Sequence, residues 1–144
     1  MIAFFDTNIL VYMLDRSETH KQGIAVDCFS NAVHHDTIAL STQVLHEFYN
    51  ITTRKLRPTL SAQEAQQQVR HLCAFEVVGS NATAIMAAMD IVQRDQMQWW
   101  DALILEAALR AKADVLYTED LQHGQRYGAL TVVNPFISSA KSTA

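Results

Sequence analysis

The fold is indicated by the stretch IAFFDTNIL at residues 2–10, in which an apolar run ends at Asp6. A short apolar run suits a buried strand of a parallel sheet, and an acid directly after it stands where such strands open onto a ligand crevice. Asp6 and Asn8 interrupt the apolar stretch and no basic residue precedes it, so we expect neither a signal peptide nor a membrane span. We therefore expect a cytoplasmic protein.

Further short apolar runs alternate with longer segments of helical periodicity. Together with Ile2–Phe5, the expected strands are residues 37–40, 75–78, 115–117 and 131–133. The helical segments carry apolar stripes formed by Ile24, Ala25, Cys28, Phe29 and Ala32, by Ala65, Val69 and Leu72, and by Ile85, Ala88, Met89 and Val92. This alternation predicts an α/β fold with a central parallel sheet covered by helices.

The composition favours one compact domain. The 144 residues are 49% hydrophobic and 18% charged, and no repeat or Pro/Gly-rich linker divides them. We expect a single domain over residues 1–144 whose polar end, residues 138–144, frays. The net charge of -4 lacks the basic excess of most nucleic-acid-binding proteins. Cys28 and Cys73 lie in apolar helical patterns without CxxC spacing, so we expect reduced core thiols.

Four acids stand where a purely structural pattern would place apolar or turn residues. Asp6 and Asp120 follow the expected strands at residues 2–5 and 115–117. Glu47 shares the apolar stripe of a helix expected over Thr42–Arg54, and Asp101 heads the apolar face of a helix that begins near Trp99. The sequence therefore predicts that separate elements direct these four carboxylates to one crevice.

Each acid taken alone has a simpler interpretation. Asp6 and Asp101 could be helix N-caps, and Asp120 could be an ordinary turn residue. Glu47 has the weakest simpler interpretation, because an acid in the middle of a helix and on its apolar stripe needs a polar partner. We expect Glu106 and Glu119 to be solvated surface acids.

A cluster of ionised carboxylates needs a positive charge. Two carboxylates about 4 Å apart repel by roughly 4 kcal/mol at an effective dielectric of 20. An all-oxygen ligand set favours Mg²⁺ or Mn²⁺, and such ions promote phosphodiester hydrolysis. Asp6 and Asp101 would be direct ligands and Asp120 a direct or water-mediated one, with Glu47 orienting metal-bound water or a second ion.

The motifs that carry these acids resemble those of the PIN-domain nucleases, most closely the VapC toxins of bacterial VapBC toxin–antitoxin modules. They are DTNIL at residues 6–10, STQVLHEF at 41–48, WDALI at 100–104 and YTEDL at 117–121 with Gly124 shortly after. The similarity extends from Ile2 to about Phe136.

The resemblance implies a Rossmann-like α/β/α sandwich around a parallel sheet of about five strands. It assigns the acidic catalytic site to Asp6, Glu47, Asp101 and Asp120, with Asn8 and Thr118 as supporting polar groups. It also implies an endoribonuclease that depends on Mg²⁺ or Mn²⁺, forms a homodimer and is inhibited by a VapB-type antitoxin. The RNA that is cut stays open.

Residues near the predicted site have two interpretations each. Arg54, Lys55 and Arg57 would bind RNA phosphates, although basic residues also suit the C-terminal end of a helix. Trp99 and Trp100 would stack on unpaired bases, or lie in the core or an interface.

Two rival functions remain open at this point. One is a catalytically inert PIN-like module that binds RNA or a protein. The other is an aspartyl-phosphate phosphatase with Asp6 as nucleophile. That chemistry usually needs an acid two residues later, where this sequence has Asn8.

Overall fold

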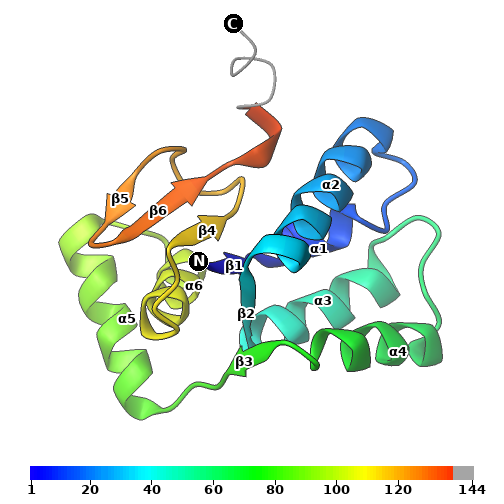
Figure 1. The fold of residues 1–144 in the computed structure, drawn as a ribbon. Coiled ribbons are helices and arrows are strands. Elements are labelled where there is room, and N and C mark those ends of the chain that lie inside the picture. The colour runs from blue at the N-terminus through cyan, green and yellow to red at the C-terminus, as the bar shows by residue number, and fades with distance from the viewer. Residues whose placement is uncertain (138–144) are drawn as a thin grey trace, which may run out of the picture.

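The computed structural model describes residues 1–137 and confirms the α/β fold. Within these residues the sheet has six strands in the order β3-β2-β1-β4-β6-β5 (Figure 1). The strands are β1 (Ile2–Phe5), β2 (Thr37–Ser41), β3 (Glu76–Val78), β4 (Val115–Tyr117), β5 (Arg126–Tyr127) and β6 (Leu130–Val133). All neighbouring pairs are parallel except β5 with β6. The predicted frayed end, residues 138–144, lies outside the described residues.

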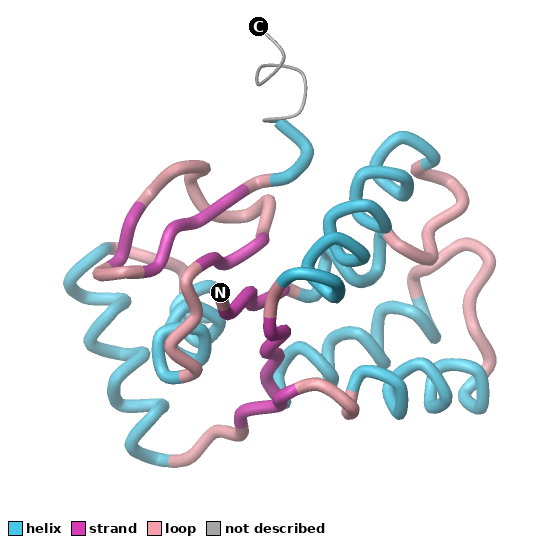
Figure 2. The backbone as a smooth tube through the Cα atoms, viewed as in Figure 1, coloured by secondary structure: helices cyan, strands magenta, loops and turns pink. Residues whose placement is uncertain are grey.

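Helices cover both faces of the sheet. On one side lie α1 (Thr7–Tyr12), α2 (Thr19–His35), α3 (Thr42–Arg54) and α4 (Ala62–Leu72), and on the other lie α5 (Ala82–Asp95) and α6 (Trp99–Arg110) (Figures 1 and 2). Side chains fix several helix starts. Ser41 accepts a hydrogen bond from the Val44 amide of α3, and Ser61 forms a capping box with Glu64. No helix in residues 1–137 is long and apolar enough to span a membrane.

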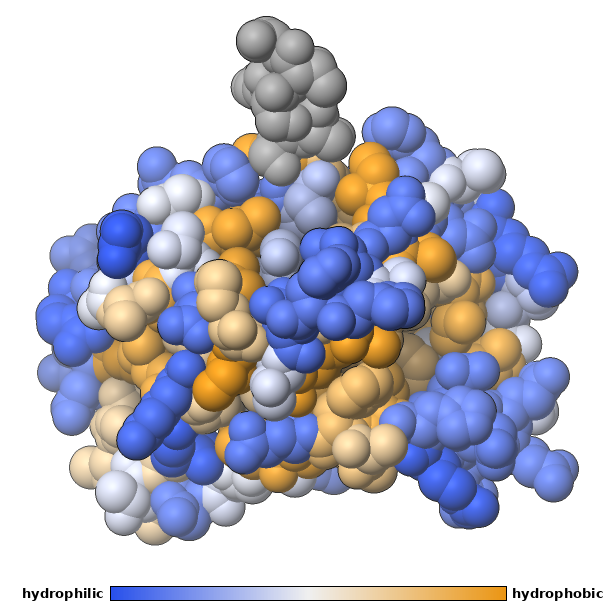
Figure 3. Space-filling model, viewed as in Figure 1, coloured by the Kyte–Doolittle hydropathy of each residue, from blue (hydrophilic) through white to orange (hydrophobic). Residues whose placement is uncertain are grey.

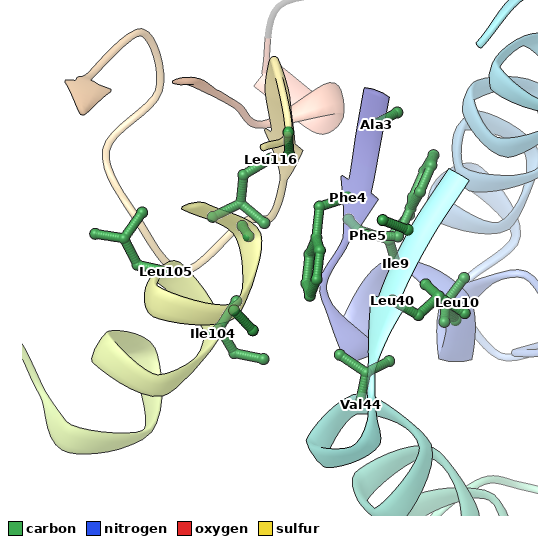
Figure 4. Packing of buried hydrophobic residues seen from close by; sticks show 14 of the residues in the cluster. Ala3, Phe4, Phe5, Ile9, Leu10, Leu40, Val44, Ile104, Leu105 and Leu116 are labelled. Atoms are coloured by element: carbon green, nitrogen blue, oxygen red, sulfur yellow. The ribbon is translucent and has the colours of Figure 1, made fainter. Parts of the chain in front are cut away.

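The core packs against β1 from both sides. Ala3, Phe4 and Phe5 are completely buried, as expected for a central parallel strand. Figure 4 shows Ile104 and Leu105 of α6 on one side of this strand and Ile9, Leu10 and Val44 of α1 and α3 on the other. Full burial of one such side chain stabilises the fold by about 1.5–3 kcal/mol, so the end of β1 has a fixed position.

Three local predictions are wrong. The antiparallel strand β5 was not expected; its two residues are too few for a periodic signal, and it pairs with β6 through a turn at Gly128, whose φ is 63°. On α5 the buried residues are Ala84, Ala88 and Ile91, so the expected stripe is rotated and Ile85 and Met89 are exposed. Cys73 is exposed rather than in the core, because it lies at the C-cap of α4.

Hydrophobic residues also reach the surface. On the face seen in Figure 3, they gather where the sheet lies between the two groups of helices, while hydrophilic residues dominate the outer flanks. The large exposed apolar side chains include Met86 on α5, which is 60% exposed, and Trp100 on α6, which is 62% exposed. Apolar residues that are exposed singly are common on protein surfaces.

Candidate active site

The candidate site lies where the strand order of the sheet reverses. From β1 the chain builds outward through β2 and β3, whereas β4 pairs with the opposite edge of β1. The amide of Asp6 donates to the carbonyl of Tyr117 at 3.0 Å, and the amide of Thr118 donates to the carbonyl of Val133 at 3.1 Å. The carboxyl ends of β1 and β4 are therefore held side by side, and such a point is the usual place of a ligand crevice in an open α/β sheet.

Asp6 is held at this point by two neutral donors. Its Oδ1 accepts from the Thr7 amide at 2.7 Å, and its Oδ2 accepts from the Thr118 hydroxyl at 2.8 Å. The Thr118 hydroxyl in turn accepts from the Asp120 amide at 3.1 Å. Asp6 is 6% exposed and is the N-cap of α1, so it caps a helix, as its simpler interpretation predicts, and also lies at the candidate site.

Glu47 reaches the same region from α3. Its Oε1 accepts from the Thr7 hydroxyl at 2.6 Å, and its Oε2 accepts from the Gln43 amide group at 3.2 Å. The Gln43 amide group also lies 3.4 Å from the carbonyl oxygen of Trp100, at the start of α6. The polar partners that a mid-helix acid requires are therefore Thr7 and Gln43, which the sequence reading missed. The spacing of four residues between Gln43 and Glu47 was the available signal.

The other two carboxylates come from two different parts of the chain, Asp101 from α6 and Asp120 from the loop after β4. Asp120 accepts from the side-chain amide of Asn8 at 3.3 Å. Asp101 lies in the first turn of α6, whose N-cap is Gln98, so its interpretation as an N-cap is wrong. Within residues 1–137 the Asp101 side chain makes neither a hydrogen bond nor a salt bridge. A carboxylate that projects into a crevice without a partner is available to a ligand.

The structure brings all four carboxylates to one pocket of about 330 Å³. The pocket is also lined by Thr7, Asn8, Gln43, Asn50, Ile51, Lys55, Trp100 and Ile104. Thr118 is buried behind this lining and contacts Asp6. Of the three basic residues considered from the sequence, only Lys55 lines the pocket, whereas Arg54 and Arg57 are exposed on the surface away from it.

Burial and mutual repulsion oppose ionisation in this pocket. Burial raises the pKa of Asp6 to about 7, with the charges of Asp120 and Glu47 adding to the effect and the hydrogen bonds from Thr118 and Thr7 opposing it. Burial, followed by the charges of Asp120 and Glu47, also raises the pKa of Asp101. The pKa of Asp120 is raised by burial and then by the nearby carboxylates Glu119 and Glu47. A cation bound here would favour the ionised forms.

The donor chemistry of the pocket fits a hard divalent cation. No three acidic, histidine or cysteine side chains in residues 1–137 stand close enough together to form a ready metal site. The pocket nevertheless presents four carboxylates and no histidine or cysteine, which is the ligand type of Mg²⁺ or Mn²⁺ rather than Zn²⁺. Asp6, Asp101 and Asp120 are the side chains suited to hold it.

Glu119, beside the pocket, is not the solvated acid that was expected. It accepts from the Tyr12 hydroxyl at 2.6 Å and forms a salt bridge of 3.0 Å with Lys21. The Lys21 ammonium also lies 4.8 Å from the centre of the Tyr12 ring and 5.2 Å from that of Phe136. These contacts tie the loop that carries Asp120 to α1 and α2. They join distant parts of the chain, so no spacing in the sequence could reveal them.

The expectation of a surface position for Glu106 is also wrong. Glu106 is 9% exposed and pairs with Arg110, whose Nε and Nη2 donate to its two oxygens at 2.8 and 3.2 Å. The spacing of four residues on a helix was the signal for this pair.

Comparisons with known proteins agree with this geometry. The model of the PIN domain family matches residues 3–128. Among curated protein sequences, no significant match to the chain was found. At 15–19% identity, likeness to the three solved structures described next concerns the fold.

Those structures come from three bacteria. A chain of a toxin–antitoxin complex from Klebsiella pneumoniae is 19% identical with a TM-score of 0.68, covering 92% of this chain and 97% of that chain. VapC20 of Mycobacterium tuberculosis, a toxin that cleaves the sarcin–ricin loop, is 15% identical with a TM-score of 0.65, covering 82% and 89%. A chain of VapBC2 from Rickettsia felis, bound to a promoter DNA fragment, is 19% identical with a TM-score of 0.63, covering 92% and 97%.

Proposed function

The chain belongs to the PIN domain family, and from this membership and the acidic pocket we propose that it is a metal-dependent endoribonuclease, the toxin of a toxin–antitoxin pair. The observation that carries the proposal is the meeting of four carboxylates from separate elements in one pocket, at the point where the strand order reverses. Neutral groups hold Asp6, Glu47 and Asp120 in place, and Lys55 is the one basic side chain in the lining that the structure describes. Such a pocket suits a cation and the phosphate that the cation binds.

Each side chain then has a distinct task. Asp6, Asp101 and Asp120 would hold Mg²⁺ or Mn²⁺, which when bound lowers the pKa of water and stabilises charge on a phosphodiester. Glu47, fixed by Thr7 and Gln43, orients the attacking water.

Supporting groups keep the ligands in position. Thr118 joins the Asp6 carboxylate to the Asp120 backbone, and Asn8 donates to the Asp120 carboxylate. Lys55, at the edge of the pocket, neutralises an RNA phosphate beside the one that is cut.

The rival functions receive less support. As a phosphatase nucleophile Asp6 would usually need an acid two residues later, but that position holds Asn8, whose side-chain amide donates to Asp120 at 3.3 Å. An inert PIN-like module would have no need for four acids in one pocket. Calorimetric titration with Mn²⁺ of the natural chain and of Glu47→Gln separates this module from the nuclease. If neither protein binds the ion, our proposal is wrong.

The proposed partners follow from the same reasoning. An antitoxin is supported by the toxin–antitoxin complexes among the similar structures. A basic side chain such as Arg would fill the acidic pocket by bidentate pairing with its carboxylates. We also propose a homodimer in the cytoplasm, and the exposed Met86 and Met89 of α5 offer apolar surface for a second copy.

The direct test is incubation of purified protein with total RNA and Mn²⁺. We expect discrete cleavage products with the natural chain, and none with Asp101→Asn or in EDTA. Circular dichroism of the variant controls for folding. Full cleavage in EDTA would contradict the metal-dependent function.

A further inference from the structure

A second and larger cavity, of about 690 Å³, opens beside the acidic pocket. Gln43, Glu47, Asn50 and Trp100 line both cavities. The two are thus one continuous depression between α3, α5 and α6. A ligand with two linked parts can occupy both of them at once.

The lining of the larger cavity differs in chemistry from the acidic pocket. Apart from the shared Glu47 it presents no carboxylate, lysine or arginine. Ile85, Trp99 and Leu103 contribute apolar surface, and His46 and Ser80 contribute hydrogen-bonding groups. A largely apolar cavity whose one carboxylate lies on the side shared with the acidic pocket suits a flat, neutral, heteroaromatic ligand rather than a phosphate.

Trp100 stands at the junction of the two cavities. Its indole is 62% exposed, although its neighbour Trp99 is half-buried and packs against the core. The carbonyl of Trp100 faces Gln43, and the next residue is the acid Asp101 of the candidate site. An aromatic ring next to the reacting groups, left uncovered by the fold, provides a stacking surface.

We propose that this cavity binds an unpaired nucleobase of the RNA substrate, stacked on Trp100 and adjacent to the phosphate that lies in the acidic pocket. The inference rests on the proposed nuclease function and adds Trp100 as a residue that binds a base of the substrate. The charge pattern supports this occupant, since a nucleotide joins a neutral base to an anionic phosphate, and the neutral cavity adjoins a cation-binding pocket. Bases in a duplex are already stacked and cannot enter.

The two tryptophans allow a direct binding test. The chain has only these two, so Trp99→Phe leaves Trp100 as the sole tryptophan and Trp100→Phe leaves Trp99. We would titrate each variant with a short single-stranded RNA in Ca²⁺, which keeps a hard cation available to the acidic pocket, and follow tryptophan fluorescence after gel analysis has shown that the RNA stays intact. We expect strong quenching in Trp99→Phe and weak quenching in Trp100→Phe, with little effect of a duplex of the same sequence.

The affinity test uses Trp100→Ala and a matched exposed aromatic. A base–aromatic stack contributes about 1–3 kcal/mol, so Trp100→Ala should weaken binding of single-stranded RNA by about 5- to 150-fold. Tyr49→Ala removes an exposed aromatic of α3 that lines neither cavity, and should leave the affinity unchanged.

The outcomes separate this inference from the nuclease function. RNA binding that depends on Trp100 without any cleavage in Mn²⁺ would contradict the function and leave the base site standing. Cleavage and binding that are indifferent to Trp100→Ala would overturn the base site alone. If light scattering shows that Trp100→Ala converts a dimer to a monomer, the cavity is covered by a second copy and the base site is also overturned. Equal quenching by duplex RNA would overturn the preference for an unpaired base.

Discussion

Two groups of carboxylates in this protein are held in opposite ways. Glu106 and Glu119 each bind a cation of the chain itself, Arg110 and Lys21 respectively. The four acids of the pocket are instead held by hydroxyl and amide groups or, for Asp101, by no side chain in residues 1–137. Both groups are removed from water to some degree, so both need positive charge nearby. The fold supplies that charge to the first group, and our proposal assigns it to a bound divalent cation for the second.

The largest difference should appear in catalysis. Asp101→Asn removes a carboxylate without changing the shape of the side chain, and we expect single-turnover cleavage of RNA in Mn²⁺ to fall by about a thousandfold or more. Glu106→Gln is the matched change in the internally paired group and should alter the rate by less than about threefold. Comparable losses in the two variants would remove the functional distinction between the groups.

Stability should respond with opposite signs. Asp6 has a pKa of about 7 in the folded chain and 3.8 as its ordinary value. Between these values the folded state retains a proton that the unfolded state has lost, so the free energy of unfolding falls as pH rises from about 4 to about 7. Asp6→Asn should remove this fall and, at pH 8 in EDTA, stabilise the protein by about 1–3 kcal/mol in urea denaturation.

The paired group provides the control for this measurement. Glu106→Gln leaves the Arg110 guanidinium without its carboxylate, so it should destabilise the protein by about 1 kcal/mol.

A bound cation should add to the stability of the natural chain. Mn²⁺ at about a hundred times its dissociation constant should stabilise the natural chain by about 2.7 kcal/mol and should stabilise Asp6→Asn much less. Destabilisation by Asp6→Asn at pH 8 would show that its carboxylate is held as firmly as that of Glu106.

A smaller effect is expected where the two groups meet, at Glu119 beside Asp120. Lys21→Met frees Glu119 from its salt bridge and loosens the loop that carries Asp120, so the affinity for Mn²⁺ in calorimetry should fall by about three- to tenfold. Arg94→Gln breaks an exposed ion pair with Asp95, neither of which lines the pocket, and should leave that affinity unchanged. An unchanged affinity in Lys21→Met would mean that the loop is held without this cluster.

The sequence indicated much of the fold because its elements follow local patterns. The strands at β1, β2 and β4 are apolar runs with both faces buried, and α3 has the predicted bounds. The hairpin strand β5 was missed because only two residues and a glycine turn define it. The stripe of α5 was misplaced because its small residue Ala84 is buried while the larger Ile85 and Met89 face outward.

The site was predicted less completely than the fold. The meeting of the four acids in one pocket followed from their positions at strand ends and on apolar stripes. The partners of Glu119 did not, because Tyr12 and Lys21 approach it only after the chain has folded. Nor could sequence distinguish Lys55 from Arg54 and Arg57, since helix geometry decides which of these neighbouring side chains reaches the pocket.

The smallest effect tests that last distinction. A lysine that contacts one phosphate of single-stranded RNA contributes about 0.7 to the slope of log affinity against log salt concentration. Lys55→Gln should therefore reduce the magnitude of the slope by about this amount, whereas Arg57→Gln, whose side chain lies outside the pocket near the Arg54 and Leu56 carbonyls, should not. Fluorescence titrations with a short RNA at several KCl concentrations and a constant Ca²⁺ concentration measure both slopes. Equal changes would show that the RNA follows the whole basic end of α3 rather than the pocket edge alone.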